Sequence, residues 1–379
     1  MTARLVISGL LAAALLFGLL RVKPPHALTI ETGPAGGSYY QDAMAYQAFL
    51  ATRGIDLKLR LRPNSLEIIK DVADPGSGVD VGFIAQDVTA SQNAPVSTIG
   101  DVELQPLFVF ASADLGRRSV LDDLRGRKVV MPPSDSATSD AALKVFDLYD
   151  ITRDNTSFTF MPLTDAVRDL RAGKFDAGVF MLAAESPVIR ELAADTGLHL
   201  VPIGEARAIA NHLPFLRPVV LPRGIYDIAD AIPPLDTPMV AAPVGIVVRK
   251  DLHPYLIYSL LQAMTKVHHH STLLTTAGDY PTIAGTQLEA HPLAEGYYRS
   301  GLPWSYRELP PWLAAFVDQY NVIVLAVLLL GLLCMTVVHL ADAGSAVVRW
   351  GLAQRRRAKK SRSSADASLS RTPPITSGR

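Results

Sequence analysis

The sequence predicts an α/β protein with two lobes, a cleft between them, and a membrane helix at each end. Short β-rich runs alternate with helical patterns between residues 28 and 268, which is typical of a parallel sheet covered by helices. Two uncharged apolar runs, residues 5–20 and 322–338, flank this body. One cysteine in 379 residues excludes an internal disulfide framework and a cysteine-cluster metal site.

In the first lobe, apolar runs that end at turn-forming residues predict strands, and amphipathic stretches between them predict helices. The expected elements are a strand over 28–32, a helix over 40–52, a strand over 57–61, a helix over 65–72 and a strand over 79–84. A longer strand over 104–111 begins the crossing to the second lobe. A strand over 240–249 returns, and a helix over 254–268 follows. Lobe 1 is therefore predicted to comprise residues 24–110 and 238–310.

Lobe 2, residues 111–237, repeats the alternation of strands and helices. In α/β sheets of this kind, ligands bind beside the carboxyl ends of the strands, and a cleft between lobes is the default pocket. The expected elements are strands over 128–131, 156–161, 177–180 and 199–202 and helices over 139–149, 165–172 and 187–196.

The two apolar runs predict a membrane topology. No cleavage site with small residues at both required positions follows residues 5–20, so an uncleaved anchor is favoured over a cleaved signal, and either exports the chain. The whole chain balances 36 basic against 36 acidic residues, but from Arg349 onward nine are basic and one is acidic. Positive residues mark the cytoplasmic side, which places the body outside. The predicted segments are a signal or anchor helix over 1–23, a transmembrane segment over 311–345 and a disordered basic tail over 346–379.

The most informative segment, residues 33–40, reads Gly-Pro-Ala-Gly-Gly-Ser-Tyr-Tyr and joins a strand to a helix. Gly36 and Gly37 let backbone N–H groups face an anion at the start of the helix. Ser38 can cap that helix, and Tyr39 or Tyr40 can wall a pocket. The flanking residues exclude a nucleotide P-loop and a nucleophile elbow. The alternative is an ordinary strand-to-helix turn.

Further polar residues stand where predicted strands end or helices begin. Each one alone is most often a helix cap, whereas several converging on one cleft would form a hydroxyl-rich site for an anion or an amide. Arg62, Arg117, Arg118 and Lys144 are possible partners for a carboxylate, although a solvated surface position is favoured for each. The candidate binding residues are Asn64, Ser65, Gln86, Asp87, Ser134, Ser136 and Thr138.

These motifs, in their shared order, resemble the TAXI family of TRAP-transporter solute receptors. The turn over 33–40 is similar to the family's signature, and Val-Asp-Val-Gly-Phe-Ile-Ala-Gln-Asp-Val over 79–88 is similar to one of its strand ends. With further matches in the second lobe, the likeness covers about residues 28–275. It implies a two-lobed periplasmic-binding-protein-like (type II) fold. It also implies a small solute, typically an acidic amino acid or dicarboxylate, and a TRAP-type permease or a sensor as the partner.

The segment over 291–303 resembles a membrane-tethered branch of these receptors, which implies a bacterial inner-membrane protein with a periplasmic body and a cytoplasmic tail. Three departures from the family pattern weaken the inference of an acidic ligand. Asn64 replaces a glycine, Gln86 is displaced by one position, and residues 135–138 replace a glycine-rich loop and add the negative charge of Asp135.

Together these observations predict a membrane-anchored, extracytoplasmic receptor that captures a small, carboxylate-bearing solute and is not an enzyme. A structural module without a ligand is one alternative. An exported enzyme on the same fold is another, but it would need a nucleophile with its base, which no recognisable spacing provides. Three consecutive histidines, 268–270, point in different directions on a helix, so no metal is predicted. No cofactor and no nucleic-acid partner are expected either.

Overall fold

The chain divides into two units, and the fold below is that of the described residues between 25 and 314. We describe it from a computed structural model. The residues that the structure describes are 25–33, 35, 37–62, 64–91, 93–116, 120–310 and short helical runs between 313 and 355.

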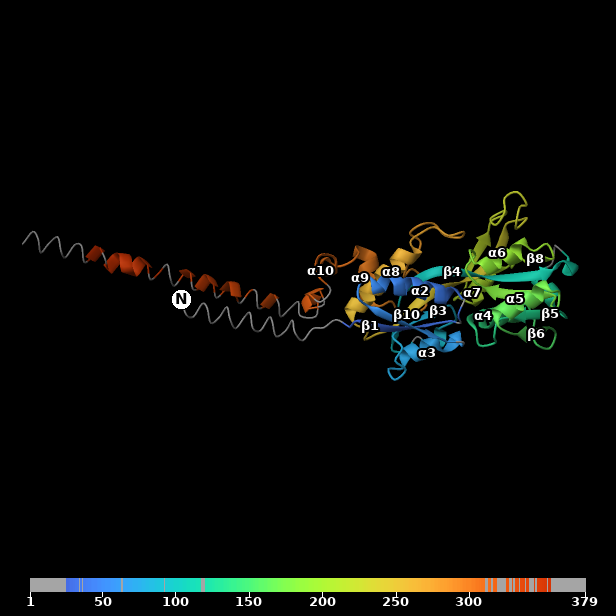
Figure 1. Cartoon of the computed structure of the whole chain (residues 1–379), viewed down its shortest axis with the longest axis horizontal. Coiled ribbons are helices and arrows are strands. Elements are labelled where there is room, and N and C mark those ends of the chain that lie inside the picture. The colour runs from blue at the N-terminus through green and yellow to red at the C-terminus, as the bar shows by residue number, and fades with distance from the viewer. Residues whose placement is uncertain are drawn as a thin grey trace, which may run out of the picture. The chain divides into compact units, whose positions relative to one another are not determined.

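In the described residues, ten strands form a sheet in the order β2-β1-β3-β10-β4-β7-β5-β6, with β8 beside β4 and β9 beside β10 (Figure 1). Strand β1 is parallel to β2 and β3, and β5 is parallel to β6 and β7, whereas β4 and β10 are antiparallel to their neighbours. The strands are β1 (Ala27–Thr32), β2 (Asp56–Leu61), β3 (Val81–Ile84), β4 (Val96–Ser112), β5 (Lys128–Met131), β6 (Ser157–Phe160), β7 (Ala177–Met181), β8 (Leu198–Leu200), β9 (Arg217–Leu221) and β10 (Thr237–Arg249).

Helices cover both faces of this sheet. The α-helices are α2 (Ser38–Ala51), α3 (Ile68–Ala73), α4 (Ala137–Asp147), α5 (Leu163–Arg171), α6 (Pro187–Ala194), α7 (Ala206–His212), α8 (Pro254–His268), α9 (Pro292–Ser300) and α10 (Trp304–Glu308). Short 3-10 turns are η1 (Ser65–Glu67), η2 (Thr89–Ser91), η3 (Ala113–Leu115) and η4 (Leu121–Leu124).

Strands β4 and β10 run through two halves of the sheet. Residues 96–106 of β4 pair with β10, and residues 107–112 pair with β7 and β8. We call β1, β2 and β3, together with residues 245–248 of β10 that pair with β3, the first sheet half. We call β5 to β8, together with residues 107–112 of β4 that pair with β7 and β8, the second sheet half. Figure 1 shows the two halves at opposite ends of the body, with β4 reaching into both. The predicted α/β class and the two predicted crossing strands are confirmed.

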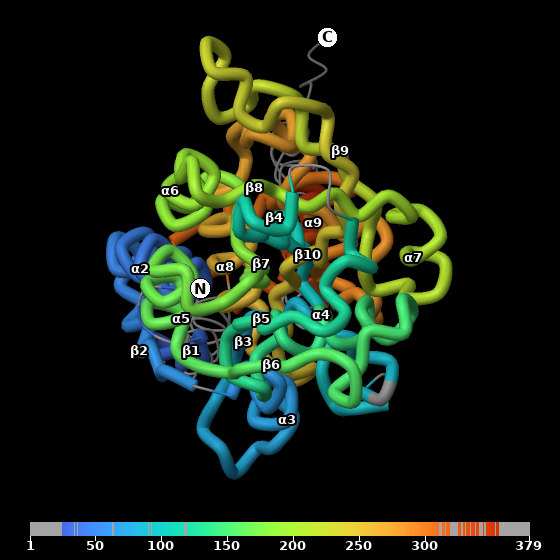
Figure 2. Tube along the Cα trace, turned by 90° about the vertical axis from the view of Figure 1, so that its right-hand side faces the viewer, coloured from blue at the N-terminus to red at the C-terminus, as the bar shows by residue number. Residues whose placement is uncertain are grey.

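In the first sheet half, α2 and α8 cover one face and α3 covers the other (Figure 1). Tyr39 and Tyr46, seven residues apart on α2, stack on Phe83 of β3 with ring centroids 5.2 and 5.9 Å away. This spacing places both rings on one helix face, so α2 forms because burial of that face stabilises it. The second sheet half, nearest the viewer in Figure 2, repeats the arrangement with α4 on one face and α5 and α6 on the other.

Several predicted boundaries are wrong. The strand predicted over 104–111 begins at Val96, because polar residues of its first part are buried and paired despite breaking the apolar pattern. The helix predicted over 65–72 is divided into η1 and α3, and α7 and β9 were not predicted. The helix predicted over 254–268 is confirmed as α8.

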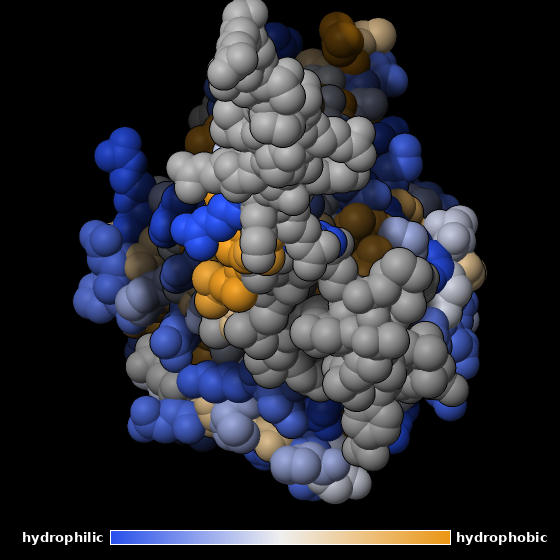
Figure 3. Space-filling view, turned by 90° about the vertical axis from the view of Figure 1, so that its left-hand side faces the viewer, coloured by the Kyte–Doolittle hydropathy of each residue, from blue (hydrophilic) through white to orange (hydrophobic). Residues whose placement is uncertain are grey.

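The predicted N-terminal helix over 1–23 and the end of the basic tail lie outside the described residues, as does part of the predicted transmembrane segment over 311–345 with its apolar run 322–338. Described residues of that segment, such as Leu329, Leu333 and Met335, are helical and largely exposed. Among the described residues, no helix is long and apolar enough to span a membrane. In the view of Figure 3, hydrophilic side chains predominate around the edge of the visible face.

The close packing of α3 on β3 gives a first prediction. A Cβ atom added to Gly82 would lie 2.2 Å from Cγ2 of Ile68 and 3.2 Å from Cγ2 of Val72. We expect Gly82→Ala to lower the free energy of unfolding by about 2 kcal/mol, because α3 must move away from the sheet. Gly204→Ala, whose Cβ would meet nothing within 4 Å, is the control and should change it little. Urea unfolding of the full chain measures both, and equal midpoints would contradict the packing described.

Candidate functional site

Ser65, Asp87 and the start of α4 lie where the two sheet halves meet. Three loops of the first half follow β1, β2 and β3 and carry Ser38, Ser65 and Asp87. The loop after β5 in the second half leads into α4. Because β1, β2 and β3 are parallel, their carboxyl ends share one edge of the sheet.

Two polar contacts join the halves at this edge. Oγ of Ser65 accepts a hydrogen bond from the backbone N–H of Ala137, in the first turn of α4, at 3.0 Å. Nζ of Lys144, two turns further along α4, lies 3.4 Å from Oδ2 of Asp87. The pKa of Asp87 is lowered, because the hydrogen bonds from Thr89 and the charge of Lys144 outweigh its partial burial. The structure thus brings Ser65, Asp87 and the start of α4 together.

The predicted residues around α4 have different surroundings. Ser136 caps the helix and accepts a hydrogen bond from the N–H of Ser139 at 3.3 Å. Thr138 is buried at the junction, and Ser134 is exposed. Ser136 therefore has the role of an ordinary cap. Of the three predicted hydroxyl residues around α4, Thr138 is the one whose side chain is buried.

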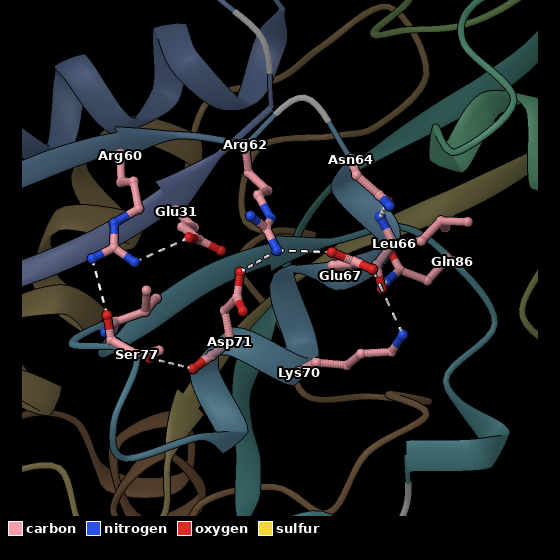
Figure 4. A network of polar contacts seen from close by, with 11 residues as sticks. Glu31, Arg60, Arg62, Asn64, Leu66, Glu67, Lys70, Asp71, Ser77 and Gln86 are labelled. Carbon is pink, nitrogen blue, oxygen red and sulfur yellow. Dashed lines mark hydrogen bonds and ion pairs between the residues drawn. The ribbon is translucent and has the colours of Figure 1, made fainter.

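The side chains of Asn64 and Gln86 form hydrogen bonds with backbone groups of Leu66 and Ala85. Oδ1 of Asn64 accepts a hydrogen bond from the N–H of Leu66 at 3.1 Å, which makes Asn64 the cap of η1 (Figure 4). Gln86 is buried; its Oε1 accepts from the N–H of Ala85, and its Nε2 donates to the carbonyl of Leu66. Both side chains shape the loops that carry Ser65 and Asp87.

The signature turn begins α2. Gly36 lies outside the described residues, and Gly37 is the N-cap, with extended backbone and no side-chain cap for the helix. Tyr40 is half-buried. Tyr39 was predicted as a pocket wall, but its ring is buried in the core against Phe83, because its helical spacing with Tyr46 faces the sheet.

Ser38 belongs to a polar cluster that the sequence did not predict. Nε2 of Gln105 on β4 donates to Oγ of Ser38 and to Oε1 of Glu103, both at 2.6 Å. Asp42, one turn after Ser38, has a buried Oδ2 atom that accepts no hydrogen bond from the described residues. We call Ser38, Asp42, Glu103 and Gln105 the acidic cluster.

The two carboxyl groups of this cluster resist ionisation. The pKa of Glu103 is raised to about 7, chiefly by burial and further by the charge of Glu185, although its hydrogen bond with Gln105 lowers it. Burial and repulsion by Glu103 hold the pKa of Asp42 well above its usual range. The negative charges here are therefore costly in the folded protein.

Of the four basic residues named above as possible carboxylate partners, the two that the structure describes already form ion pairs within the protein. Arg62 lies 2.8 Å from Glu67 and 3.0 Å from Asp71, within the network of Figure 4 that also holds buried Glu31 and Arg60. Burial and the nearby Asp71 raise the pKa of Glu31 to about 6. Lys144 pairs with Asp87 and Asp140. Arg117 and Arg118 lie outside the described residues.

Two cavities lie away from the predicted residues. One of about 10 Å³, the size of one water molecule, is lined by Asp101, Thr98 and Gln287. The other, of about 530 Å³, lies between α7 and β9. Among the described residues, no group of three or more histidine, cysteine, aspartate or glutamate side chains is placed to hold a metal ion.

The raised pKa of Glu103 gives a prediction for stability. Since its folded pKa exceeds the ordinary value of 4.5, its protonated form stabilises the fold below about pH 4.5, and this contribution is lost as the pH rises through about 7. Between pH 4.5 and about pH 8, the unfolding free energy of the wild type should fall by on the order of 2 kcal/mol more than that of Glu103→Gln.

Urea unfolding of the full chain at several pH values tests this. The carboxyl groups that act on Glu103 are Asp42 and Glu185. Glu103→Gln also removes the repulsion that raises the pKa of Asp42, so the difference between the two profiles reports Glu103 together with its effect on Asp42. Glu295→Gln, which removes an exposed carboxylate on α9, should keep the wild-type profile. Parallel profiles of wild type and Glu103→Gln would contradict the assignment.

Comparisons with known proteins place the chain in a family. Solved structures similar to it include the amino acid transporter substrate-binding protein AbpA from Streptococcus pneumoniae, bound to L-arginine (13% identity, 64% of this chain, 88% of that chain, TM-score 0.39). Another is the SsuA protein from Xanthomonas axonopodis pv. citri (13% identity, 64% of this chain, 73% of that chain, TM-score 0.42). A third is the SsuA protein from Escherichia coli (14% identity, 78% of this chain, 83% of that chain, TM-score 0.41). The NMT1-like family model matches residues 30–300, most of the chain, and the protein therefore belongs to the NMT1-like family.

Proposed function

We propose that the chain is a solute-binding receptor and not an enzyme, with lobes formed by residues 24–110 with 238–310 and by residues 111–237. The observation that carries this is the meeting of polar groups from both sheet halves at one place, Ser65 with Ala137 and Asp87 with Lys144. The halves are joined through β4 and β10, the architecture expected for hinge closure around a solute.

We propose a small, carboxylate-bearing solute, such as an amino acid. The start of α2 supports this, because Gly37 leaves the first N–H groups of a fourteen-residue helix without a side-chain cap. Ser38 is the first residue of α2, and Thr138 lies in the first turn of α4. The sequence resemblance supports a TAXI-type receptor that passes its solute to a TRAP-type permease or to a sensor.

We further propose that the protein is anchored in the inner membrane with its body in the periplasm. Exposed apolar helical residues such as Leu329, Leu333 and Leu340 support an apolar environment for this segment. The basic residues that follow support a cytoplasmic tail.

Solute binding is tested by thermal unfolding of the full chain in detergent with amino acids, dicarboxylates, keto acids and short fatty acids. A solute at 100 times its dissociation constant should stabilise the protein by about 2.7 kcal/mol. Ser38→Ala should weaken the binding about tenfold, since a hydrogen-bonding group is lost. Ser157→Ala, an exposed serine on β6, is the control. A folded protein that no solute stabilises would favour the structural module.

Membrane anchoring is tested by expressing the full chain in bacteria. We expect it to stay in the membrane after alkaline extraction, because an apolar span resists release. In spheroplasts, external protease should degrade the body and spare an epitope at the C-terminus. Release of the chain by alkaline extraction, or loss of the epitope from intact spheroplasts, would contradict the topology.

A further inference from the structure

Two members of the acidic cluster, Asp42 and Glu103, carry carboxyl groups whose negative charge would repel a carboxylate. We infer that Asp42 and Glu103 bind a positively charged nitrogen of the solute, an ammonium or guanidinium group. This inference rests on the proposed function as a solute receptor and specifies the chemistry of the same site.

The cluster is built at the start of α2, beside the signature turn. Ser38 and Asp42 are four residues apart and therefore share one face of the helix. Glu103 and Gln105 are two residues apart on β4 and share one face of the strand. The amide nitrogen of Gln105 joins the two elements through Ser38 and Glu103. The loop and the crossing strand thus present carboxylates to one place.

Neither carboxylate has a basic partner among the ion pairs of the described residues. Other shielded carboxylates do: Glu31 lies 3.4 Å from Arg60, Asp87 lies 3.4 Å from Lys144, and Asp101 lies 3.6 Å from Arg217. Asp42 and Glu103 instead repel each other. A buried negative charge is stabilised by a positive one, and here the protein's described residues supply none.

The buried Oδ2 atom of Asp42 indicates a missing hydrogen-bond donor at the cluster, independently of the charges. It has no hydrogen-bond donor among the described residues, although buried carboxylate oxygens are generally hydrogen-bonded. An ammonium group carries three N–H donors and a guanidinium group five, which matches the acceptors of Asp42 and Glu103.

The second sheet half adds negative charge to the same region. Glu185 lies in the loop between β7 and α6, and its charge acts on Glu103. Its side chain also accepts a hydrogen bond from the N–H of Leu273, and Arg190 donates to its backbone carbonyl. A cation between the halves would therefore interact with both, which favours closure.

The experiment compares solutes that differ in one positive group. Isothermal titration of the full chain in detergent uses L-arginine with L-citrulline, L-glutamate with L-2-hydroxyglutarate, and putrescine with 4-aminobutan-1-ol. We expect the cationic member of at least one pair to bind about 10- to 100-fold more tightly than its partner. Asp42→Asn and Glu103→Gln should each reduce that ratio about tenfold. Asp56→Asn, which removes an exposed carboxylate on β2, should preserve it.

The outcomes separate this inference from the proposed function. Equal binding within every pair, or ratios unchanged by Asp42→Asn and Glu103→Gln, would overturn the inference and leave a solute receptor. Binding of no solute by a folded protein would overturn both. Melting temperatures of the variants show that they fold. Glu103→Gln should melt at or above the wild-type temperature at about pH 8, above the raised pKa of Glu103, because a buried charge is removed.

Discussion

The antiparallel pairing of β4 with β10 is the constraint on which the rest of the body depends. Both strands extend past the first sheet half, so residues on them have fixed places relative to the loops of both halves. The pairing shifts register between Val244 and Gly245, where a Cβ atom at Gly245 would lie 3.0 Å from Oδ1 of Asp101. A side chain at this position would press on the Asp101 carboxylate and on Cγ1 of Ile84, 3.3 Å away. The same strand, β4, carries Glu103 and Gln105 to the start of α2.

This pairing also explains where prediction of the fold from sequence failed. The strands and helices with regular apolar spacing, such as α8 and β1, were predictable because their pattern is local. The first part of β4 was not, since Thr98 and Asp101 are polar and yet buried. Their backbone partners, Thr282 and His291, lie almost 200 residues further along the chain. A strand whose polar groups are paired by a distant segment has no local signature.

The candidate site divides in the same way. Ser65 and Asp87 were predictable, because polar residues that end parallel strands collect at one edge of a sheet. The acidic cluster was not, because a carboxylate on a helix is ordinarily exposed to solvent, and only the sheet brings Glu103 to Asp42. Arg62 and Lys144 were considered as ligand partners because sequence alone does not reveal their ion pairs with Glu67 and Asp87.

The two contacts between the halves bear on how a solute would be held. The hydrogen bond from Ala137 to Ser65 and the ion pair of Lys144 with Asp87 are each worth about 1 kcal/mol or less. They stabilise the arrangement in which the halves touch, but contacts of this strength are too weak to fix that arrangement by themselves. A solute that contacts both halves adds to them, whereas one that contacts a single half shifts nothing. Opposite charges then provide selectivity: the start of α2 favours an anionic group and the acidic cluster a cationic one. A solute with both groups would satisfy α2 and β4 together and so couple its binding to the strand that joins the halves.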